Sequence, residues 1–362
     1  MDLKAKIDNI EFKKLTPRAL FCELTFRCNL NCIHCFCNGY NPEGEKELTF
    51  EEWRDCIDQA IERGVAWVTF SGGEPFLHPR IFDLMLYARQ AGLSVILKTN
   101  ATLIGRDEVR RLKELYVRDI AVSLYAMNPE IHDRVTGVSG SFEKTMQAVK
   151  LLREENFAVY LTPVALKGIN VSEILPMYEF ARKNRCSFSV GIDLLPNYAG
   201  LDDIVEKLQI SAEDIKMIVE ETSKDRNFVA SEARYPCGVS DPNGPIHINP
   251  YGYVFPCLTM QVERIIDKND NVRIRRLSEI PAKSTFYKLL PGLTWDSFPE
   301  CKECRYRIYC HRCFIAEYIR TGSFYGSPSY ANCATARFAY EIMQERRDVN
   351  AKKQMENACN RN

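Results

Sequence analysis

From about residue 18 to residue 230, short runs of apolar and β-branched residues alternate with longer stretches in which apolar residues recur at helical spacing. The short runs predict strands at residues 20–24, 67–70, 95–99, 120–124, 159–164 and 188–192. The stretches between them predict helices at residues 51–63, 80–90, 107–115, 142–154 and 174–184.

Strand-then-helix units repeated in this way predict a parallel sheet with right-handed crossovers. Six units are too few to close an eight-stranded barrel. The expected fold is therefore α/β, a partial (β/α)6 barrel of the TIM type. In such folds the chemistry lies on the loops at the carboxyl ends of the strands.

The alternation stops after one more predicted helix at residues 211–224. From about residue 233 the chain carries Pro and Gly residues, a predicted hairpin (strands 246–249 and 254–255 around a turn at 250–252) and a closing helix at 334–353. We therefore expect four parts: an N-terminal segment (1–17), the partial barrel (18–232), a small C-terminal module (233–340) and a helix with a tail (341–362).

Composition narrows the class of protein. The chain has 362 residues, with 48 Lys and Arg balanced by 48 Asp and Glu. This zero net charge argues against a general nucleic-acid binder, which needs a basic surplus. No apolar run reaches the roughly 18 residues that span a bilayer, and the start lacks the basic-then-apolar pattern of a signal peptide. We expect a cytoplasmic protein with neither nucleic acid nor membrane as a partner.

Fifteen cysteines are unusual for such a chain. Cytosolic thiols stay reduced, so a disulfide framework is not expected. Five cysteines lie between Cys22 and Cys37, and five more lie between Cys301 and Cys333. Clustering of this kind is typical of metal ligands, because a short segment must bring several thiolates to one ion or cluster.

The loop after the first predicted strand carries a C-x3-C-x2-C spacing at Cys28, Cys32 and Cys35. Zinc is one candidate, but structural zinc sites prefer four protein ligands. Three thiolates on one loop suit a [4Fe–4S] cluster in which one iron is open to a small ligand.

Further candidate residues follow the next three strands. Gly72-Gly73-Glu74-Pro75 comes after the second predicted strand, Asn100 ends the third and Ser123 ends the fourth. Together with the three cysteines, these residues resemble the radical S-adenosylmethionine (SAM) superfamily. The resemblance implies that the open iron binds the amino and carboxylate groups of SAM, whose cleavage yields a 5′-deoxyadenosyl radical.

The resemblance also implies roles for residues in the cofactor site. The glycines of the Gly-Gly-Glu-Pro run let the backbone approach the methionine part of SAM, and Glu74 accepts a hydrogen bond from its ammonium group. Asn100 lies close to SAM, and Ser123 holds its ribose or carboxylate. Many relatives bind the carboxylate with an arginine where this chain has Thr136, and Arg134 lies two residues earlier. The residue that binds the carboxylate is therefore not assigned.

A second group comprises seven cysteines, Cys237, Cys257, Cys301, Cys304, Cys310, Cys313 and Cys333. Read alone, the two C-x2-C pairs within residues 301–313 are also typical of a zinc ribbon. Beside the radical SAM motifs, the whole pattern resembles a SPASM extension, which carries auxiliary [4Fe–4S] clusters. One gap departs from that pattern, because two residues separate Cys310 from Cys313 where three are commoner.

The resemblance divides the seven cysteines between two clusters. One set is Cys237, Cys257 and Cys313, and the other is Cys301, Cys304, Cys310 and Cys333. The first set offers three thiolates, so its fourth ligand comes from the substrate or from another residue, such as Cys22 or Asp241. The short gap keeps a single auxiliary cluster as the alternative.

SPASM relatives mostly modify peptides, so the resemblance implies an oxidoreductase-type maturase that crosslinks, epimerises or oxidises a ribosomally made peptide. A haem-type tetrapyrrole side-chain decarboxylase is the alternative, since those relatives share the two-residue gap. Sulfatase maturases are disfavoured because they carry Asp where Leu258 stands here. A non-catalytic iron–sulfur electron carrier is disfavoured because it needs no SAM pocket, and hence no Glu74.

The resemblance further implies a peptide or protein substrate and a flavodoxin or ferredoxin as electron donor. Only 27 residues precede Cys28, fewer than the ~40 at which a domain usually folds alone. Leader recognition is therefore expected from a separate protein or from the catalytic core.

Overall fold

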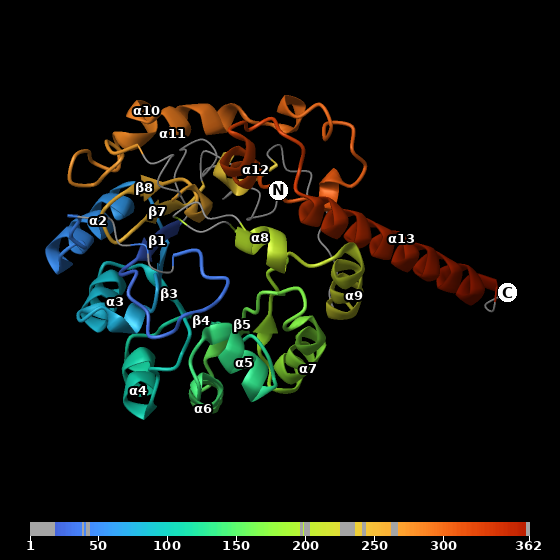
Figure 1. Cartoon of the computed structure of the whole chain (residues 1–362), viewed down its shortest axis with the longest axis horizontal. Helices are drawn as coiled ribbons and strands as arrows, with labels where there is room; N and C mark the ends of the chain where they lie inside the picture. The colour runs from blue at the N-terminus through green and yellow to red at the C-terminus, as the bar shows by residue number, and fades with distance from the viewer. Residues whose placement is uncertain are drawn as a thin grey trace. The chain divides into compact units, whose positions relative to one another are not determined.

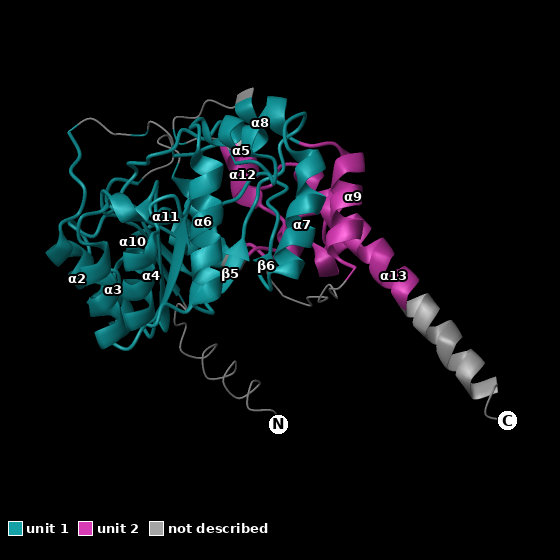
Figure 2. Ribbon diagram, turned by 90° about the horizontal axis from the view of Figure 1, so that it is seen from below, with its two compact units in different colours: residues 1–209, 238–292 teal, residues 210–237, 293–362 magenta. Residues whose placement is uncertain are grey.

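The computed structural model describes residues 19–37, 40, 44–195, 198, 203–224, 236–240, 244–261 and 267–359. The chain divides into two compact units (Figure 2). The first unit comprises Met1–Gln209 with Gly238–Gly292, and the second comprises Ile210–Cys237 with Leu293–Asn362. The domain boundaries expected after residues 17, 232 and 340 stay predictions.

One sheet organises the first unit (Figure 1). Its strands are β1 (Ala19–Glu23), β2 (Trp67–Ser71), β3 (Ser94–Thr99), β4 (Asp119–Val122), β5 (Ala158–Leu161), β6 (Ser187–Phe188), β7 (Ile246–Ile248) and β8 (Val254–Phe255). Their order is β6-β5-β4-β3-β2-β1-β7-β8, and every neighbouring pair is parallel except β7 and β8. The expected α/β fold with an open partial barrel is confirmed.

Helices connect the strands and cover one side of the sheet. The main helices of this unit are α2 (Phe50–Glu62), α3 (Ile81–Gln90), α4 (Arg106–Glu114), α5 (Pro129–Thr136), α6 (Ser141–Glu154), α7 (Ile174–Lys183), α8 (Asp203–Leu208), α10 (Ile280–Lys283) and α11 (Thr285–Leu289). The start of α2 shows why such a segment is helical. Thr49 and Glu52 form a capping box, which satisfies backbone N–H groups at the first turn.

The two sides of the sheet differ in polarity because successive side chains of a strand point to opposite sides. The helix-covered side is apolar and fully buried, as at Leu20, Cys22, Val68, Phe70, Val95, Leu97, Ile120 and Val122. The inner side of the partial barrel carries polar side chains such as Glu23, Ser71, Lys98 and Ser123. A polar inner face at the carboxyl ends of the strands is suited to bind ligands.

Two features differ from the sequence-based expectation. The predicted hairpin is present, but β7 pairs with β1 and so extends the barrel sheet by two strands. Helix α5 lies in a segment for which no helix was predicted. Its signals were local: Asn128 caps the helix, Pro129 is its first residue, and Gly137 follows in the left-handed conformation.

The second unit is helical (Figure 2). Its helices are α9 (Ala212–Thr222), α12 (Phe314–Thr321) and α13 (Tyr330–Cys359). Helix α13 packs against α9 and is longer at both ends than the predicted helix at 334–353. The cysteines from Cys301 to Cys313 lie on the irregular segment before α12, and Cys333 lies in the first turn of α13.

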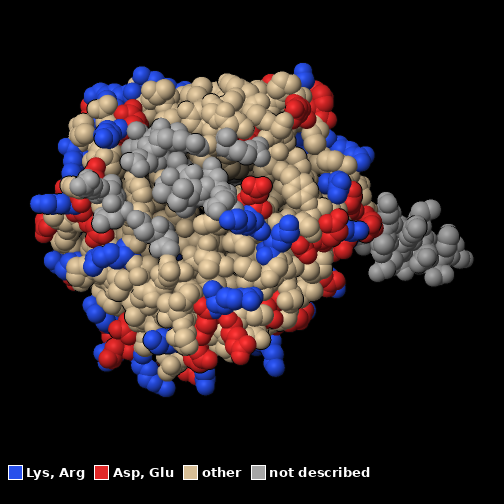
Figure 3. Space-filling model, in the orientation of Figure 1, with Lys and Arg blue, Asp and Glu red and all other residues tan. Residues whose placement is uncertain are grey.

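Surface charge is mixed in sign. Figure 3 shows basic and acidic side chains interspersed over the face that it draws. Among the residues that the structure describes, no helix has both the length and the apolar character needed to cross a membrane.

Candidate functional site

The three-cysteine loop follows β1 and is held in place by its backbone. The N–H of Asn31 donates to the carbonyl oxygen of Thr136 at 2.8 Å, and the N–H of Ile33 donates to that of Val135 at 3.0 Å. Both acceptors lie at the end of α5. Gly137 allows this approach, since a Cβ there would lie 2.7 Å from the oxygen of Asn31. The missed helix α5 is therefore part of the support of the cysteine loop.

The thiols of Cys28, Cys32 and Cys35 influence one another electrostatically. Burial, together with the negative charges that Cys35 and Cys28 can carry, raises the pKa of Cys32 to about 12. Nevertheless, no three His, Cys, Asp or Glu side chains in the described part of the chain converge on a single metal-ion position. Three thiols on one loop suit a [4Fe–4S] cluster, in which each thiolate binds a different iron.

The Gly-Gly-Glu-Pro run packs against the segment that leads into the cysteine loop. The N–H of Gly73 donates to Thr25 O at 2.7 Å, and the N–H of Glu74 donates to Arg27 O at 2.9 Å. A Cβ on Gly72 would lie 2.3 Å from Thr25 O, and one on Gly73 would lie 2.4 Å from Arg27 O. The glycines are thus required by the protein's own backbone, whatever else approaches them.

The carboxylate of Glu74 is fully buried. It accepts hydrogen bonds from Thr99 Oγ1 at 2.8 Å, from the N–H of Asn100 at 2.8 Å and from the N–H of Phe76 at 3.2 Å. Burial raises the pKa of Glu74 to about 7, against the effect of these donors. Glu74 therefore ties the end of β3 to the loop after β2.

Asn100 continues this connection toward the cysteines. Its Nδ2 donates to Asn29 Oδ1 at 3.0 Å and lies 3.8 Å from the Sγ of Cys28. Ser123 is half-buried at the end of β4, where its N–H donates to Thr99 O at 3.1 Å. The ends of β2, β3 and β4 thus carry the polar residues named from the sequence.

The two candidates for the carboxylate of SAM have other contacts. Thr136 is buried, and its hydroxyl lies 2.7 Å from Ser141 Oγ. Arg134 is exposed, and its Nη2 donates to Ile169 O at 3.4 Å.

The inner face of the barrel adds residues that sequence analysis missed. Glu23 is 3% exposed, accepts a hydrogen bond from Gln261 and has its pKa raised to about 7 by burial. The ammonium of Lys98 lies 5.3 Å from the ring centre of Phe21. Desolvation lowers the pKa of Lys98. Solvent still reaches its side chain, because Lys98 faces the open inner side of the curved sheet. The sequence signal for Glu23 and Lys98 was a charged residue within an otherwise apolar strand.

Four thiols of the second unit form another electrostatic group. Burial, together with the charges that Cys333, Cys301 and Cys304 can carry, raises the pKa of Cys310 to about 12. The pKa of Cys333 is raised by burial and then by Cys301 and Cys304. These are the four cysteines that the family pattern assigns to one auxiliary cluster.

The remaining auxiliary candidates have separate local contacts. Cys257 donates to Thr259 Oγ1 at 3.4 Å, and the Sγ of Cys313 accepts from Ala316 N at 3.4 Å at the start of α12. Cys237 precedes a short 3-10 turn. Of the two possible fourth ligands, Cys22 is buried on the helix-covered side near Cys56, and Asp241 lies outside the described residues. The division of the cysteines between clusters stays a prediction.

Comparison with known proteins gives related sequences and folds. Residues 22–181 match the model of the Radical SAM superfamily. The chain is 35% identical to an AdoMet-dependent heme synthase of Methanosarcina barkeri over 46% of this chain and 48% of that protein. It is 25% identical to a PqqA peptide cyclase of Bradyrhizobium diazoefficiens over 80% of this chain and 79% of that protein.

The fold is similar to that of SuiB of Streptococcus suis, solved with its precursor peptide SuiA. The TM-score is 0.69 at 18% identity, over 91% of this chain and 80% of that one. The chain spans about half the length of the heme synthase and of an Fe-coproporphyrin III synthase of the same archaeon. The matched residues 22–181 contain the three-cysteine loop, Glu74, Asn100 and Ser123. The chain thus contains a radical SAM domain at residues 22–181.

Proposed function

We propose that the chain is a radical SAM enzyme whose catalytic [4Fe–4S] cluster is held by Cys28, Cys32 and Cys35. One observation carries the proposal: three mutually interacting thiols lie on the loop after β1, inside the matched domain, beside Glu74 and Asn100. When bound, the cluster and SAM supply a carbon-centred radical that removes a hydrogen atom from the substrate.

The chain's own residues orient these groups. Glu74 holds the N–H of Asn100, and Asn100 in turn places its Nδ2 near Cys28. Gly72 and Gly73 let the loop after β2 lie against residues 25–27, so the cofactor site is built on closely packed backbone. We place SAM against Gly72, Gly73, Glu74, Pro75, Asn100 and Ser123, at the carboxyl ends of β2 to β4.

The substrate is, in this proposal, a ribosomally made peptide. The alignment with the PqqA peptide cyclase supports it, because it covers 80% of this chain, whereas the heme synthase alignment covers 46%. Glu23 and Lys98 on the inner face are the residues that we propose contact the peptide. The electron donor (a flavodoxin or ferredoxin), a separate leader-recognition protein and a cytoplasmic location belong to the same proposal.

Tetrapyrrole decarboxylation is the second candidate. Two observations favour it, namely the higher identity of 35% to the heme synthase and the two-residue gap between Cys310 and Cys313. The two candidates differ in the substrate that stimulates SAM cleavage.

The test is anaerobic reconstitution followed by turnover. We expect eight to twelve irons per chain, on the order of two or three [4Fe–4S] clusters. Candidate peptides encoded near the gene, or an iron tetrapyrrole with propionate side chains, are then added with reductant and SAM. Mass spectrometry of the peptide should reveal the modification. Decarboxylation of the tetrapyrrole with unchanged peptides would favour the alternative, and absence of SAM cleavage with every substrate would refute both.

Substrate contact by Lys98 is tested separately. Lys98→Met should raise the KM for the peptide while leaving SAM affinity unchanged, because Lys98 faces the inside of the sheet. Lys150→Met is the matched control, since Lys150 is exposed on α6 and pairs with Glu154. An unchanged KM in Lys98→Met would exclude the contact.

A further inference from the structure

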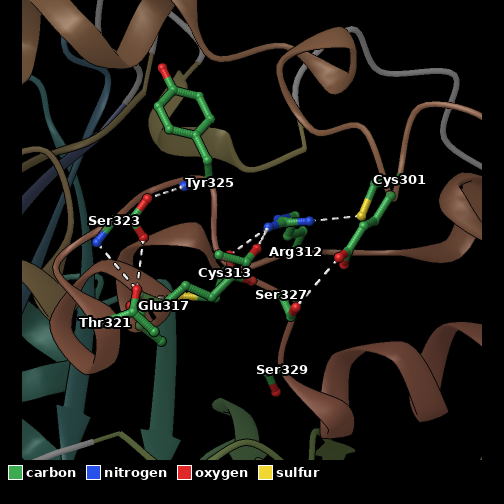
Figure 4. A network of polar contacts seen from close by, with 12 residues as sticks. Cys301, Arg312, Cys313, Glu317, Thr321, Ser323, Tyr325, Ser327 and Ser329 are labelled. Carbon is green, nitrogen blue, oxygen red and sulfur yellow. Dashed lines mark hydrogen bonds and ion pairs between the residues drawn. The ribbon is translucent and has the colours of Figure 1, made fainter.

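A buried arginine contacts a thiol of the second unit (Figure 4). Arg312 lies between Cys310 and Cys313, and it is 1% exposed. Its Nη1 donates to the Sγ of Cys301 at 2.8 Å, and its Nη2 donates to Glu317 Oε2 and to Gly326 O, each at 2.5 Å. The guanidinium also lies over the ring of Phe298, 4.2 Å from its centre.

Burying a guanidinium is costly unless a partner compensates its charge. Glu317 provides that partner and is equally buried, at 1% exposed. One of the guanidinium's remaining hydrogen bonds goes to a sulfur atom, which as a neutral thiol is a weak acceptor. As a thiolate it would be a strong, charge-assisted acceptor. The arrangement is therefore better satisfied when Cys301 is a thiolate, as in a metal ligand.

We propose that Arg312 is a positioning residue that hydrogen-bonds the Cys301 thiolate and thereby raises the reduction potential of the auxiliary cluster held by Cys301, Cys304, Cys310 and Cys333. This inference rests on the auxiliary cluster of the proposed function. Reduction adds one negative charge to the cluster, and a nearby buried cation stabilises the more negative state. Solvent screens the interaction between Arg312 and the sulfur of Cys301 little, because both residues are buried.

Glu317 acts in the opposite direction. Its carboxylate compensates Arg312 and lowers the net positive field at the sulfur. Removal of the negative charge of Glu317 should therefore favour reduction of the cluster, and removal of the positive charge of Arg312 should disfavour it. Opposite shifts from two residues of one ion pair distinguish electrostatic tuning from general damage, which would move both variants in the same direction.

The experiment uses full-length protein carrying Cys28→Ala, Cys32→Ala and Cys35→Ala, so that only auxiliary clusters contribute. After anaerobic reconstitution, potentials are measured by redox titration with electron paramagnetic resonance, and iron is counted for each variant. Arg312→Gln should lower the equilibrium constant for reduction of one cluster about tenfold, or ~59 mV for a one-electron couple. Glu317→Gln should raise it by a similar factor.

Arg305→Gln is the matched control. Arg305 also neighbours a cysteine of the set, Cys304, but its side chain is exposed and donates to Tyr306 Oη. Its removal should leave the potential unchanged. If Arg312→Gln fails to hold iron, Glu317→Gln carries the test, since it retains the arginine.

The outcomes separate this inference from the function on which it rests. Unchanged potentials in iron-loaded Arg312→Gln and Glu317→Gln, or shifts of the same sign, overturn the role of Arg312 and leave the radical SAM function intact. If the protein with Cys28, Cys32 and Cys35 replaced by Ala shows no auxiliary cluster signal, the role of Arg312 is overturned as well. Failure of SAM cleavage in otherwise iron-replete wild-type protein instead refutes the proposed function.

Discussion

The two thiol groups differ in what surrounds their sulfur atoms. Near the sulfur of Cys28 lie neutral donors, the N–H of Leu30 at 3.4 Å and the Nδ2 of Asn100 at 3.8 Å. The sulfur of Cys301 instead receives a hydrogen bond from the buried guanidinium of Arg312 at 2.8 Å. Cys28 is exposed, whereas Cys301 is buried.

This difference fits the different roles that we propose for the two sites. A cluster that must bind SAM needs one accessible iron, and three thiols on one loop leave that position open. A cluster with four thiols has no such position, and its surroundings can act only on its charge. Neutral donors and exposure therefore suit binding, and a buried cation suits the tuning of a potential.

The largest expected effect comes from removing the first thiol group while the second group stays intact. Replacing Cys28, Cys32 and Cys35 together by Ala should abolish 5′-deoxyadenosine formation, because no open iron remains. Iron bound by the second group should stay, in an amount of about four or more per chain. Chromatography of the nucleoside product and iron analysis check both parts. Formation of 5′-deoxyadenosine at the wild-type rate would contradict the site.

The division within the second group is tested by single substitutions. Cys301→Ala should remove one auxiliary cluster, and Cys313→Ala should remove the other, with Cys237→Ala behaving like Cys313→Ala. Spectra of each variant, recorded without the radical SAM cluster, identify which signal is lost. Loss of the same signal from Cys301→Ala and Cys313→Ala would mean that the partition is wrong.

Glu74→Ala should affect the first site alone. It removes the acceptor for Thr99 Oγ1 and for the N–H groups of Asn100 and Phe76. The family resemblance also implies a charge-assisted hydrogen bond from the ammonium of SAM to Glu74. Loss of that bond costs roughly 1.5–3 kcal/mol, so SAM affinity should fall about ten- to a hundred-fold. Equilibrium binding of SAM to the reconstituted variant measures it. Unchanged affinity would show that this carboxylate does not organise the site.

Gly73→Ala should produce a smaller, structural effect. The new Cβ would lie 2.4 Å from the oxygen of Arg27, so the backbone before the cysteine loop must move. Such overpacking costs typically about 1–3 kcal/mol. Gly292→Ala is the control, because nothing lies within 4 Å of the Cβ that it would add. The midpoint of thermal unfolding should fall in the first variant and stay unchanged in the second.

The smallest expected effect comes from an exposed ion pair, the counterpart of the buried pair of Arg312 and Glu317. Arg273 donates hydrogen bonds to Glu52 and lowers the pKa of Glu52 to about 2. A lowered pKa contributes stability above the unfolded value of about 4.3, and that stability is lost only as the pH falls toward 2.

Glu52→Gln should therefore lower the free energy of unfolding by less than about 1 kcal/mol, since solvent reaches both partners. The loss should be constant between pH 6 and 8 and should decrease at high salt. Urea unfolding at three pH values and two salt concentrations measures it. A loss that varies with pH in this range would mean that Glu52 titrates there.

The sequence by itself determined the class of fold and the chemistry of its conspicuous motifs. Alternation of apolar runs with helical periodicity is a local property, so the parallel strands β1 to β4 were predictable within a few residues. The spacing of Cys28, Cys32 and Cys35 is also local, and so is the run of glycines before Glu74. Short motifs such as these can be read from the sequence, because a few adjacent residues supply the groups that the chemistry needs.

Only the tertiary structure decided which distant residues meet. The pairing of β7 with β1 joins segments more than 200 residues apart, and no local pattern encodes such a contact. The placement of Glu23 beside Gln261 likewise depends on packing between separate segments. The contact of Arg312 with Cys301 lies within one irregular segment, but it depends on how that segment folds back on itself. A buried charge is tolerated only where another part of the chain supplies its partner, and the complete fold determines where that partner lies.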